Sequence, residues 1–421
     1  MKTPELHHLF IKQKQNITTD TRKIKPGAIY FALKGDHFNG NTFAKLALDK
    51  GASYAIIDEK EHHIDKRTLL VSNVLESLQQ LAYFHREYLE IPIIALTGSN
   101  GKTTTKELLR EILATQFKVN ATFGNLNNHI GVPLTLLEMT SDTEIGIVEM
   151  GANHLKEIQH LCFIAAPNFA YITNFGKAHI EGFGSEEGII QGKSEMYDYI
   201  ANSEGITFVN KEEKRMVRQA ELCECIFIEP QKTPLLDLTP YVQIAYNGIT
   251  IQSNLIGKYN YNNLIAAIKI GSYFNISHEN TKRAIENYTP QNNRSQIIEK
   301  NNTRIILDAY NANPSSMIAA LDNLNSLNDN NKVVILGDMF ELGKTSKKEH
   351  KTIVNKVLSY DYNTAIFVGK NFYKEKTKEA KFFASFEDLK NNFDFDLPLN
   401  NTTILIKGSR GMALERCLDL L

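Results

Sequence analysis

The stretch TGSNGKTTTKE, residues 97–107, constrains the fold of this chain more than any other segment. It follows the apolar run IPIIAL and precedes a stretch with helical spacing, so it predicts a glycine-rich turn between a strand and a helix. Backbone N–H groups in such a turn form a phosphate site together with the helix N-terminus. Leu96 stands where the full GxxxxGK[ST] pattern has its first glycine. The segment therefore predicts nucleotide binding in an α/β domain, but it does not say what happens to the phosphate.

Each part of this loop has an expected contact. The ammonium group of Lys102 would reach the β- and γ-phosphates, and the hydroxyl of Thr103 or Thr104 would bind Mg²⁺. The glycines would let the backbone approach the phosphate closely. The residues expected to contact nucleotide here are Gly98, Ser99, Asn100, Gly101, Lys102, Thr103 and Thr104.

Length and charge limit the class of protein. With 421 residues the chain is longer than one hydrophobic core usually serves, so two or three domains are expected. Its 47 basic and 48 acidic residues give a net charge of −1, which provides no field to attract nucleic acid or an anionic membrane. Four scattered cysteines lack the paired spacing of a zinc site. No signal-peptide core or apolar run of about 20 residues occurs, so a cytoplasmic protein with reduced thiols is expected.

Patterning along the chain predicts three α/β domains, with boundaries at 1–88, 89–290 and 291–421. In the first, short strands rich in β-branched and aromatic residues are expected at 28–33, 53–57 and 68–71, with helices at 41–52 and 74–89. In the second, the P-loop strand and the buried runs EIGIVEM and NFAYITN alternate with helical stretches, which is typical of a parallel sheet covered by helices.

The third domain is expected to contain a second parallel sheet of Rossmann-like form. The polar stretch QNNRSQIIEKNN, residues 291–302, is interpreted as a linker. Beyond it the apolar runs RIILD, KVVIL, TAIFV and TTILIK recur at intervals separated by helical patterns. The asparagine-rich segments 328–332 and 390–401 are interpreted as loops.

Three further residues could take part in chemistry. Glu149 ends a predicted buried strand, where it could bind a metal as a Walker-B-type acid or cap the next turn. His179 lies in a glycine-containing loop after another such strand, and a histidine of this kind is either a metal ligand or simply solvated. Lys193 lies on a helical stretch beside Glu195, where a lysine is usually a solvated cation.

Several motifs are spread over nearly the whole chain. In order they are TTDTRKIKPGAIYFALKG, TGSNGKTTTKE, GNLNNHIGVPLTLL, EMGANHLKEI, TNFGKAHIEGFGSEEGIIQGKSE, DAYNANPSSM, LGDMFELG and KGSRGMALE. Their order and approximate spacing resemble those of the Mur ligase family, and the first motif resembles the region of that family that binds the UDP-sugar.

The resemblance implies a function for each domain: binding of the UDP-muramoyl-peptide, binding of ATP, and ligation. Within the family it favours the ADP-forming ligase that adds D-alanyl-D-alanine to UDP-N-acetylmuramoyl-tripeptide in the cytoplasmic synthesis of peptidoglycan precursors. A carboxylate of the peptide would attack the γ-phosphorus of ATP, and the amine of D-alanyl-D-alanine would then displace phosphate from the acyl phosphate. Two Mg²⁺ ions are implied, and a monomer is expected.

The resemblance also assigns roles to residues. Glu149 and His179 would hold Mg²⁺, and Lys193 would be carbamylated, which turns a repelling cation into an oxygen ligand that a hard cation prefers. Asn263, Arg294 and Asp308 would hold adenine and ribose. The residues implied to contact the peptide substrates are Thr21, Arg22, Asn125, Asn127, Asn128, Tyr310, Asn311, Asn313, Lys407 and Ser409.

The sequence departs from the family pattern at two positions. Tyr259 stands where the family tends to have histidine, which affects only a minor nucleotide contact. Leu307 stands where a second aspartate is common, so Asp308 remains the single acidic candidate for ribose.

Other functions are consistent with parts of the sequence. A sibling Mur ligase or a folylpolyglutamate synthase would share the P-loop, Glu149, His179 and Lys193, although NANP and GDMFELG favour the dipeptide-adding member. A P-loop motor would not need the lysine at the metal, and a guanine-type NKxD motif is missing from the sequence. A non-catalytic nucleotide-binding subunit would not need to retain every candidate metal ligand. No recognisable pattern in the sequence indicates the third residue of the substrate peptide or the general base for the incoming amine. The same holds for the arrangement of the domains.

Overall fold

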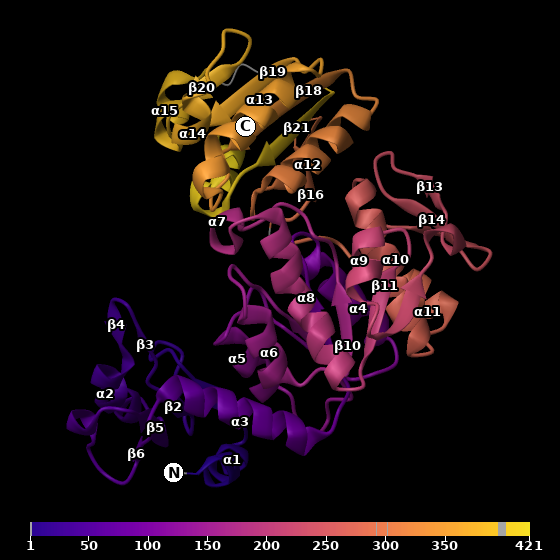
Figure 1. The fold of residues 1–421 in the computed structure, drawn as a ribbon. Helices are drawn as coiled ribbons and strands as arrows, with labels where there is room; N and C mark the ends of the chain where they lie inside the picture. Colours follow the sequence, from indigo (N-terminus) through magenta and orange to yellow (C-terminus); the bar gives the residue numbers. More distant parts are fainter. Residues whose placement is uncertain (1, 292, 301, 395–400) are drawn as a thin grey trace.

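The computed structural model describes residues 2–291, 293–300, 302–394 and 401–421. Figure 1 shows three α/β units that follow one another along the chain, with the two termini in the units at opposite ends. The expected α/β architecture with three domains is therefore confirmed. Residues 395–400, which belong to the segment expected to form a loop at 390–401, lie outside the described residues.

The N-terminal unit has a parallel sheet in the order β1-β2-β5-β6, with the hairpin β3-β4 beside it. The strands expected at 28–33, 53–57 and 68–71 are β2, β5 and β6. The helix expected at 41–52 is shorter, because a 3₁₀ turn at Gly40–Phe43 precedes it. The bounds are α1 Thr3–Lys12, β1 Ile17–Thr18, β2 Ile29–Phe31, β3 Lys34–Gly35, β4 Phe38–Asn39, α2 Ala44–Asp49, β5 Tyr54–Ile57, β6 Thr68–Leu70 and α3 Val74–Leu89.

Helix α3 joins this unit to the next. It begins after Asn73, whose side chain accepts a hydrogen bond from the backbone N–H of Glu76, and it ends at Glu90 in the left-handed conformation. Its apolar positions, among them Leu78 and Leu81, recur at helical spacing and are buried. Because α3 packs on α1 on one side and on α5 and α6 on the other, it fixes the N-terminal unit against the central one.

The central unit has a fully parallel sheet in the order β12-β11-β10-β7-β9-β8, and the P-loop strand β7 lies near its middle. The expected runs EIGIVEM and NFAYITN form β9 and β10. The bounds are β7 Ile93–Thr97, α4 Lys102–Leu113, β8 Val119–Ala121, α5 Gly131–Leu137, β9 Ile145–Glu149, α6 Glu157–Ala165, β10 Phe169–Ile172, α7 Ile180–Phe183, α8 Glu186–Asn202, β11 Ile206–Asn210, α9 Lys214–Gln219 and β12 Glu224–Ile228.

A small antiparallel sheet, β13-β14-β15, follows β12 and was not predicted. Two helices complete the unit, and α10 packs along the P-loop helix α4. The bounds are β13 Leu235–Asp237, β14 Gln243–Tyr246, β15 Ile249–Gln252, α10 Lys258–Tyr273 and α11 His278–Asn287.

The C-terminal sheet has the order β16-β17-β21-β18-β19-β20 and is parallel except at β16. Strand β16 corrects the interpretation of residues 291–302 as a linker, since Gln296–Lys300 pair with β17. The bounds are β16 Gln296–Lys300, β17 Thr303–Asp308, α12 Pro314–Ser326, β18 Asn331–Gly337, α13 Ser346–Leu358, β19 Thr364–Val368, α14 Lys370–Tyr373, β20 Lys381–Phe383, α15 Phe386–Asn392 and β21 Thr402–Lys407.

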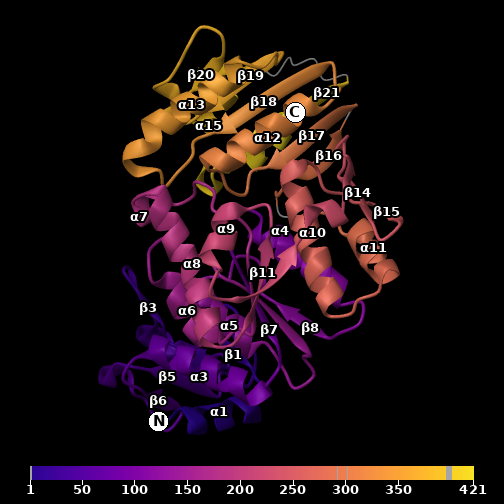
Figure 2. The ribbon, with the colours of Figure 1, turned by 45° about the vertical axis from the view of Figure 1, so that its right-hand side comes forward.

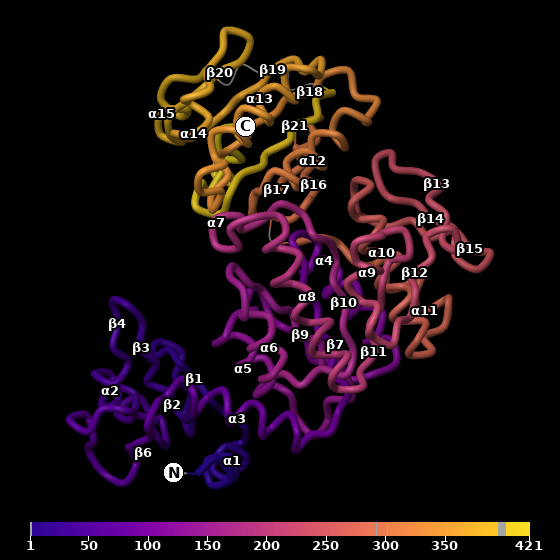
Figure 3. The backbone as a smooth tube through the Cα atoms, in the orientation of Figure 1, coloured from indigo at the N-terminus to yellow at the C-terminus, as the bar shows by residue number. Residues whose placement is uncertain are grey.

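The C-terminal unit lies on the central unit in both ribbon views (Figure 1, Figure 2), where α7 contacts the 3₁₀ turn at Gly343–Thr345 and α10 contacts α12. Figure 3 follows the tube from the indigo N-terminal unit through α3 into the central sheet and then upward to the C-terminal unit. One buried apolar cluster runs from Leu6 to Leu405 and so includes residues of all three units. The carboxyl ends of the central strands face the beginning of α12, where Asn313 is hydrogen-bonded to Asn100 of the P-loop.

Within the described part of the chain, no helix combines the length and apolar character needed to cross a bilayer.

Candidate active site

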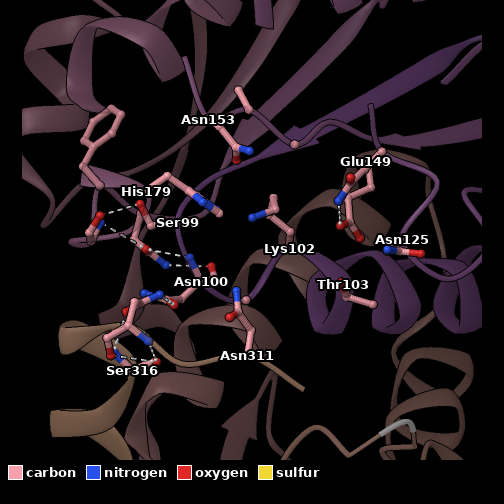
Figure 4. A pocket seen from close by; sticks show the side chains of 18 of the residues that line it. Ser99, Asn100, Lys102, Thr103, Asn125, Glu149, Asn153, His179, Asn311 and Ser316 are labelled. Carbon is pink, nitrogen blue, oxygen red and sulfur yellow. Dashed lines mark hydrogen bonds between the residues drawn. The ribbon is translucent and has the colours of Figure 1, made fainter. Parts of the chain in front are cut away.

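A cavity of about 1490 Å³ lies where the three units meet. Its wall includes the first turns of α3, the P-loop with the start of α4, the loops after β8, β9 and β10, and the segment that leads into α12. Parallel α/β sheets bind ligands at the carboxyl ends of their strands, which is where this cavity lies. Figure 4 shows Lys102 between the loop that carries Ser99 and Asn100 and the strand end that carries Glu149.

Close contacts explain the two glycines of the P-loop. A Cβ at Gly98, which has φ +141°, would lie 1.9 Å from Oγ1 of Thr173. A Cβ at Gly101, which has φ +81°, would lie 2.4 Å from Oδ1 of Asn263. Only glycine fits positions with such backbone angles and so little space. Asn263, predicted to contact nucleotide, therefore packs directly on the turn before α4, where its Oδ1 also accepts from Oγ1 of Thr105 at 3.2 Å.

Lys102 is the first residue of α4, and its Nζ donates to the carbonyl oxygen of Gly98 at 2.6 Å. Burial lowers the pKa of Lys102, and the nearby carboxylate of Glu149 opposes this shift. The side chain thus lies across the P-loop. The first backbone N–H groups of α4, which are available to an anion, lie next to it. A bound phosphate would offer the ammonium group better acceptors than a neutral carbonyl.

Asn100 is held from two sides. Its backbone N–H donates to Oδ1 of Asn174 at 3.1 Å, and its carbonyl accepts from Nδ2 of Asn174 at 2.8 Å. From the C-terminal unit, Nδ2 of Asn313 donates to Oδ1 of Asn100 at 2.7 Å. Sequence reasoning did not single out Asn174, although it lies two residues after β10, near a strand end of the kind that identified Glu149 at the end of β9.

Glu149 has one carboxylate oxygen without a hydrogen-bond partner. Its Oε1 accepts from Nδ2 of Asn127 at 2.8 Å, whereas Oε2 is buried and has no hydrogen-bond partner among the described residues. Nζ of Lys106 lies 3.9 Å from Oε2 and donates to the carbonyl of Thr122 at 2.7 Å. A buried oxygen of this kind beside a P-loop is suited to a hard divalent cation, which prefers oxygen ligands. Lys106 was not predicted, because nothing in the motif distinguishes it from a solvated lysine on α4.

His179 ends the loop after β10 and has φ +55°, an uncommon left-handed backbone conformation for a histidine. The imidazole lines the cavity, and its Nδ1 is hydrogen-bonded to a carboxylate oxygen of Glu341 from the C-terminal unit. This hydrogen bond lowers the pKa of Glu341, against the effect of burial. The described residues contain no group of three or more His, Cys, Asp and Glu side chains arranged to hold a metal. A metal here would therefore depend on the hydroxyl of Thr103 and on phosphate oxygens as well as on Glu149 and His179.

Lys193 is only 1% exposed, on the buried face of α8, and does not line the cavity. Its Nζ lies 5.5 Å from the centre of the Phe183 ring, and no ion pair of Lys193 is found among the described residues. Burial, followed by the positive charge of Lys102, lowers the pKa of Lys193 well below its usual value. An unpaired buried lysine is costly as a cation, so this environment favours the neutral amine, the form that can react with CO₂.

Two of the three residues predicted to hold adenine and ribose, Arg294 and Asp308, lie at the start of the C-terminal unit, whereas Asn263 lies on α10 of the central unit. Oδ1 of Asp308 accepts from the backbone N–H of Ser295 at 3.1 Å, and its Oδ2 lies 2.5 Å from Nζ of Lys407. The guanidinium of Arg294 lies over the ring of Tyr310, 3.6 Å from its centre. Asp308 and Lys407 were assigned to different substrates, whereas the structure pairs them.

The two departures noted in the sequence also have structural explanations. Tyr259 lines the cavity and shares a hydrogen bond of 2.8 Å with Oγ of Ser295, so it stands beside Asp308. Leu307 is 2% exposed in the core of the C-terminal sheet, where a second aspartate would be buried among apolar side chains.

Most of the predicted site residues line this one cavity. Five do not, and they differ in where they lie. Gly98 and Lys193 lie beneath the cavity wall, and Ser409 is buried where its Oγ accepts from the backbone N–H of Phe340. Thr21 and Arg22 lie in the N-terminal unit, with Arg22 paired to Asp20 on the surface. The lining residues among the predicted set are Ser99, Asn100, Gly101, Lys102, Thr103, Thr104, Asn125, Asn127, Asn128, Glu149, His179, Asn263, Arg294, Asp308, Tyr310, Asn311, Asn313 and Lys407.

The fold and this cavity define a P-loop protein that gathers residues of three α/β units around one nucleotide-type site. Three family descriptions match the chain in order: Mur ligase family, catalytic domain, at residues 14–92; Mur ligase middle domain at residues 96–271; and Mur ligase, glutamate ligase domain, at residues 293–410. The chain belongs to the Mur ligase family.

Relatives of known name agree with this assignment. The UDP-N-acetylmuramoyl-tripeptide–D-alanyl-D-alanine ligase of Bacillus subtilis is 33% identical over 423 residues, which cover 95% of this chain and 91% of the relative. The protein of the same name from Buchnera aphidicola is 34% identical and covers 97% of this chain and 92% of its own length.

Solved structures are similar over the same length. A crystal structure of MurF from Acinetobacter baumannii has a TM-score of 0.86 at 30% identity and covers 96% of this chain and 93% of the other. The MurF ligase of Thermotoga maritima in complex with ADP has a TM-score of 0.84 at 25% identity and covers 97% of each chain.

Proposed function

We propose that this chain is an ATP-dependent, ADP-forming ligase that joins D-alanyl-D-alanine to UDP-N-acetylmuramoyl-tripeptide. The observation that carries the proposal is the cavity of about 1490 Å³ in which the P-loop lysine and the partly unpartnered carboxylate of Glu149 face residues of both outer units. The names of the relatives described above support the same reaction.

The reaction needs a phosphoryl transfer and an acyl transfer in one place. A carboxylate of the tripeptide attacks the γ-phosphorus of ATP, which gives an acyl phosphate and ADP. The free amine of D-alanyl-D-alanine then attacks the acyl carbon, and phosphate leaves. Both steps depend mainly on the positioning of the reactants and on neutralisation of charge, so the side chains need not form covalent bonds with the substrate.

The residues of the central unit would handle the phosphates. Lys102 would exchange its bond to the carbonyl of Gly98 for bonds to the β- and γ-phosphate oxygens, while the N–H groups at the start of α4 hold the same anion. Thr103, Glu149, His179 and a carbamylated Lys193 would hold two Mg²⁺ ions. Bound Mg²⁺ would neutralise negative charge on the transferring phosphoryl group.

The remaining contacts would come from all three units. Asn263, Arg294 and Asp308 would hold adenine and ribose, with Tyr259 beside them. Asn125, Asn127 and Asn128 would lie against the muramoyl-peptide, as would Thr21 and Arg22 of the N-terminal unit. From the C-terminal unit, Tyr310, Asn311, Asn313, Lys407 and Ser409 would position the reacting ends of the two peptides.

The test is a comparison of acceptors. Release of ADP would be measured with UDP-N-acetylmuramoyl-tripeptide and, in turn, D-alanyl-D-alanine, L-lysine, meso-diaminopimelate and L-glutamate. We expect D-alanyl-D-alanine alone to stimulate ADP release. Stimulation by one of the single amino acids would assign the chain to a sibling ligase, and ADP release that needs no acceptor would indicate an ATPase of another kind.

We further propose that the protein acts as a monomer in the cytoplasm, where ATP is available. The balanced charge of the chain is consistent with small-molecule substrates.

A further inference from the structure

Glu341 lies in the loop after β18 of the C-terminal unit and makes two contacts with the central unit. Its side chain is hydrogen-bonded to Nδ1 of His179, and its backbone carbonyl accepts from the N–H of Glu181 in the first turn of α7 at 3.2 Å. Next to it, Gly343 lies against the side chain of Glu181. One short loop of the C-terminal unit thus holds both ends of the His179–Glu181 turn.

The loop that presents Glu341 is itself firmly held. The backbone N–H of Met339 donates to Nε2 of His350, and that of Phe340 donates to Oγ of Ser409 at 2.9 Å. Nδ1 of His350 lies 2.7 Å from the carbonyl oxygen of Ser346, which fixes the imidazole as a donor at Nδ1 and an acceptor at Nε2. Glu341 therefore approaches His179 from a loop anchored to α13 and to the end of β21.

The contact determines which nitrogen of His179 is available. An ionised carboxylate only accepts hydrogen bonds, so the proton of a neutral His179 lies on Nδ1 and the lone pair lies on Nε2. Carboxylates that hold a ligating histidine in this way fix its tautomer and its ring orientation and raise its affinity for the metal.

We propose that Glu341 is a positioning residue that orients His179 for metal binding, so that the metal site is complete only when the C-terminal unit contacts the central unit. The proposal rests on the proposed function, in which His179 is a metal ligand. The proposal gives the GDMFELG segment a role at the domain interface. This segment carries the side chain of Glu341 to His179, the proposed metal ligand in the central unit.

The experiment measures binding of Mn²⁺ by electron paramagnetic resonance, with the full chain and the ATP analogue AMPPCP. We expect Glu341→Ala to raise the Kd for Mn²⁺ about tenfold or more. Glu341→Gln should restore most of the affinity, because its carbonyl oxygen can still accept from Nδ1. Binding of AMPPCP without metal should be unchanged, since Glu341 does not line the cavity.

A matched control separates this contact from the interface as a whole. Glu349, on α13 of the same unit, lies 3.7 Å from Nζ of Lys177 in the central unit and does not contact His179. Glu349→Gln should therefore leave the Kd for Mn²⁺ unchanged. An equal loss in Glu349→Gln and Glu341→Ala would overturn the proposal, because closure in general would then be responsible. Tighter binding by Glu341→Ala would overturn it as well, because Glu341 would then compete with the metal for His179.

His179→Ala distinguishes failure of this inference from failure of the proposed function. If His179→Ala weakens Mn²⁺ binding but Glu341→Ala does not, the metal site stands and the role of Glu341 is wrong. If His179→Ala also leaves the Kd unchanged, His179 is not a ligand, and both the inference and that part of the proposed function are wrong.

Discussion

At the scale of single residues, the most informative side chains are buried polar groups without full partners. Oε2 of Glu149 has no hydrogen-bond partner among the described residues, and the amine nitrogen of Lys193 lies beside an aromatic ring. Such groups cost free energy in an empty site, so they are retained where a ligand or a modification satisfies them. The sequence identified both residues, the first from its position at a strand end and the second only from the family resemblance.

Lys102→Ala should abolish turnover and leave the fold intact. The side chain makes one hydrogen bond, to the carbonyl of Gly98, so its loss should cost about 1 kcal/mol of stability. The same side chain would stabilise charge on the transferring phosphoryl group, and removal of such a contact lowers kcat by roughly 100- to 1,000-fold. Thermal unfolding and steady-state ADP release would be measured together. Turnover within tenfold of the parent would contradict the role of the P-loop lysine.

Lys193→Ala should lower kcat by roughly 100-fold or more, because a carbamate ligand and its negative charge are lost together. A short carboxylic acid such as acetate or propionate should restore part of the rate, since it can place an anionic oxygen in the vacated space. Lys193→Arg should not be active, because a guanidinium stays charged and does not take up CO₂. Near-normal kcat in Lys193→Ala would show that this lysine is only a buried helix residue.

At the scale of elements, the sequence predicted well wherever a local pattern sets the structure. The strand, glycine turn and helix of β7 and α4 have such a pattern, and so do the apolar runs of the C-terminal sheet. It failed at β16, where Gln296–Lys300 is half polar and becomes a strand only because β17 provides an edge to pair with. It also gave no sign of the Glu341–His179 contact, because that contact depends on two loops that are far apart in sequence.

Gly98→Ala tests how closely the turn between β7 and α4 is packed. We expect loss of nucleotide binding, because the new Cβ would meet Oγ1 of Thr173 at 1.9 Å and would have to adopt φ +141°. Gly248→Ala is the matched control. It has φ +81° in the β14–β15 turn, with no atom within 4 Å of its Cβ, so it carries backbone strain alone. Binding of a fluorescent ADP analogue would be measured for both variants. Normal binding by Gly98→Ala would mean that the turn can move aside, and that its conformation is not required for the phosphate site.

At the scale of the whole molecule, each outer unit is joined to the central unit in a different way. The C-terminal unit is held by polar contacts at the cavity, such as Asn313 with Asn100 and Glu341 with His179. The N-terminal unit is held by the apolar side of α3 and by the hydrogen bond between the buried His85 and the carbonyl oxygen of Met139. Polar contacts at the rim of a cavity can be exchanged for contacts with ligands, so movement on substrate binding is expected chiefly at the C-terminal unit.

From the pair of His7 and His85 we predict that acid weakens the contact between the N-terminal and central units. Nε2 of His7 on α1 lies 3.0 Å from Nδ1 of His85 on α3, and Nε2 of His85 lies 2.9 Å from the carbonyl oxygen of Met139 in the central unit. Since that carbonyl only accepts, His85 is protonated at Nε2 and His7 donates to its Nδ1. His85, whose Nδ1 accepts, is therefore neutral in the folded protein.

Burial, and next the proximity of His85, lower the pKa of His7 from 6.5 to about 4. The unfolded chain therefore takes up a proton at a higher pH than the folded chain, so the free energy of unfolding should fall as the pH decreases from about 7 towards 4. His7→Gln keeps a donor for Nδ1 of His85 but cannot be protonated, and it should reduce this slope. Urea unfolding at pH 7.5, 6.5 and 5.5 would compare the parent with the variant, and His37→Gln, at an exposed histidine of the β3–β4 hairpin, would serve as the control. Equal slopes in the parent and in His7→Gln would mean that acid acts elsewhere, and that this pair does not make the joint sensitive to pH.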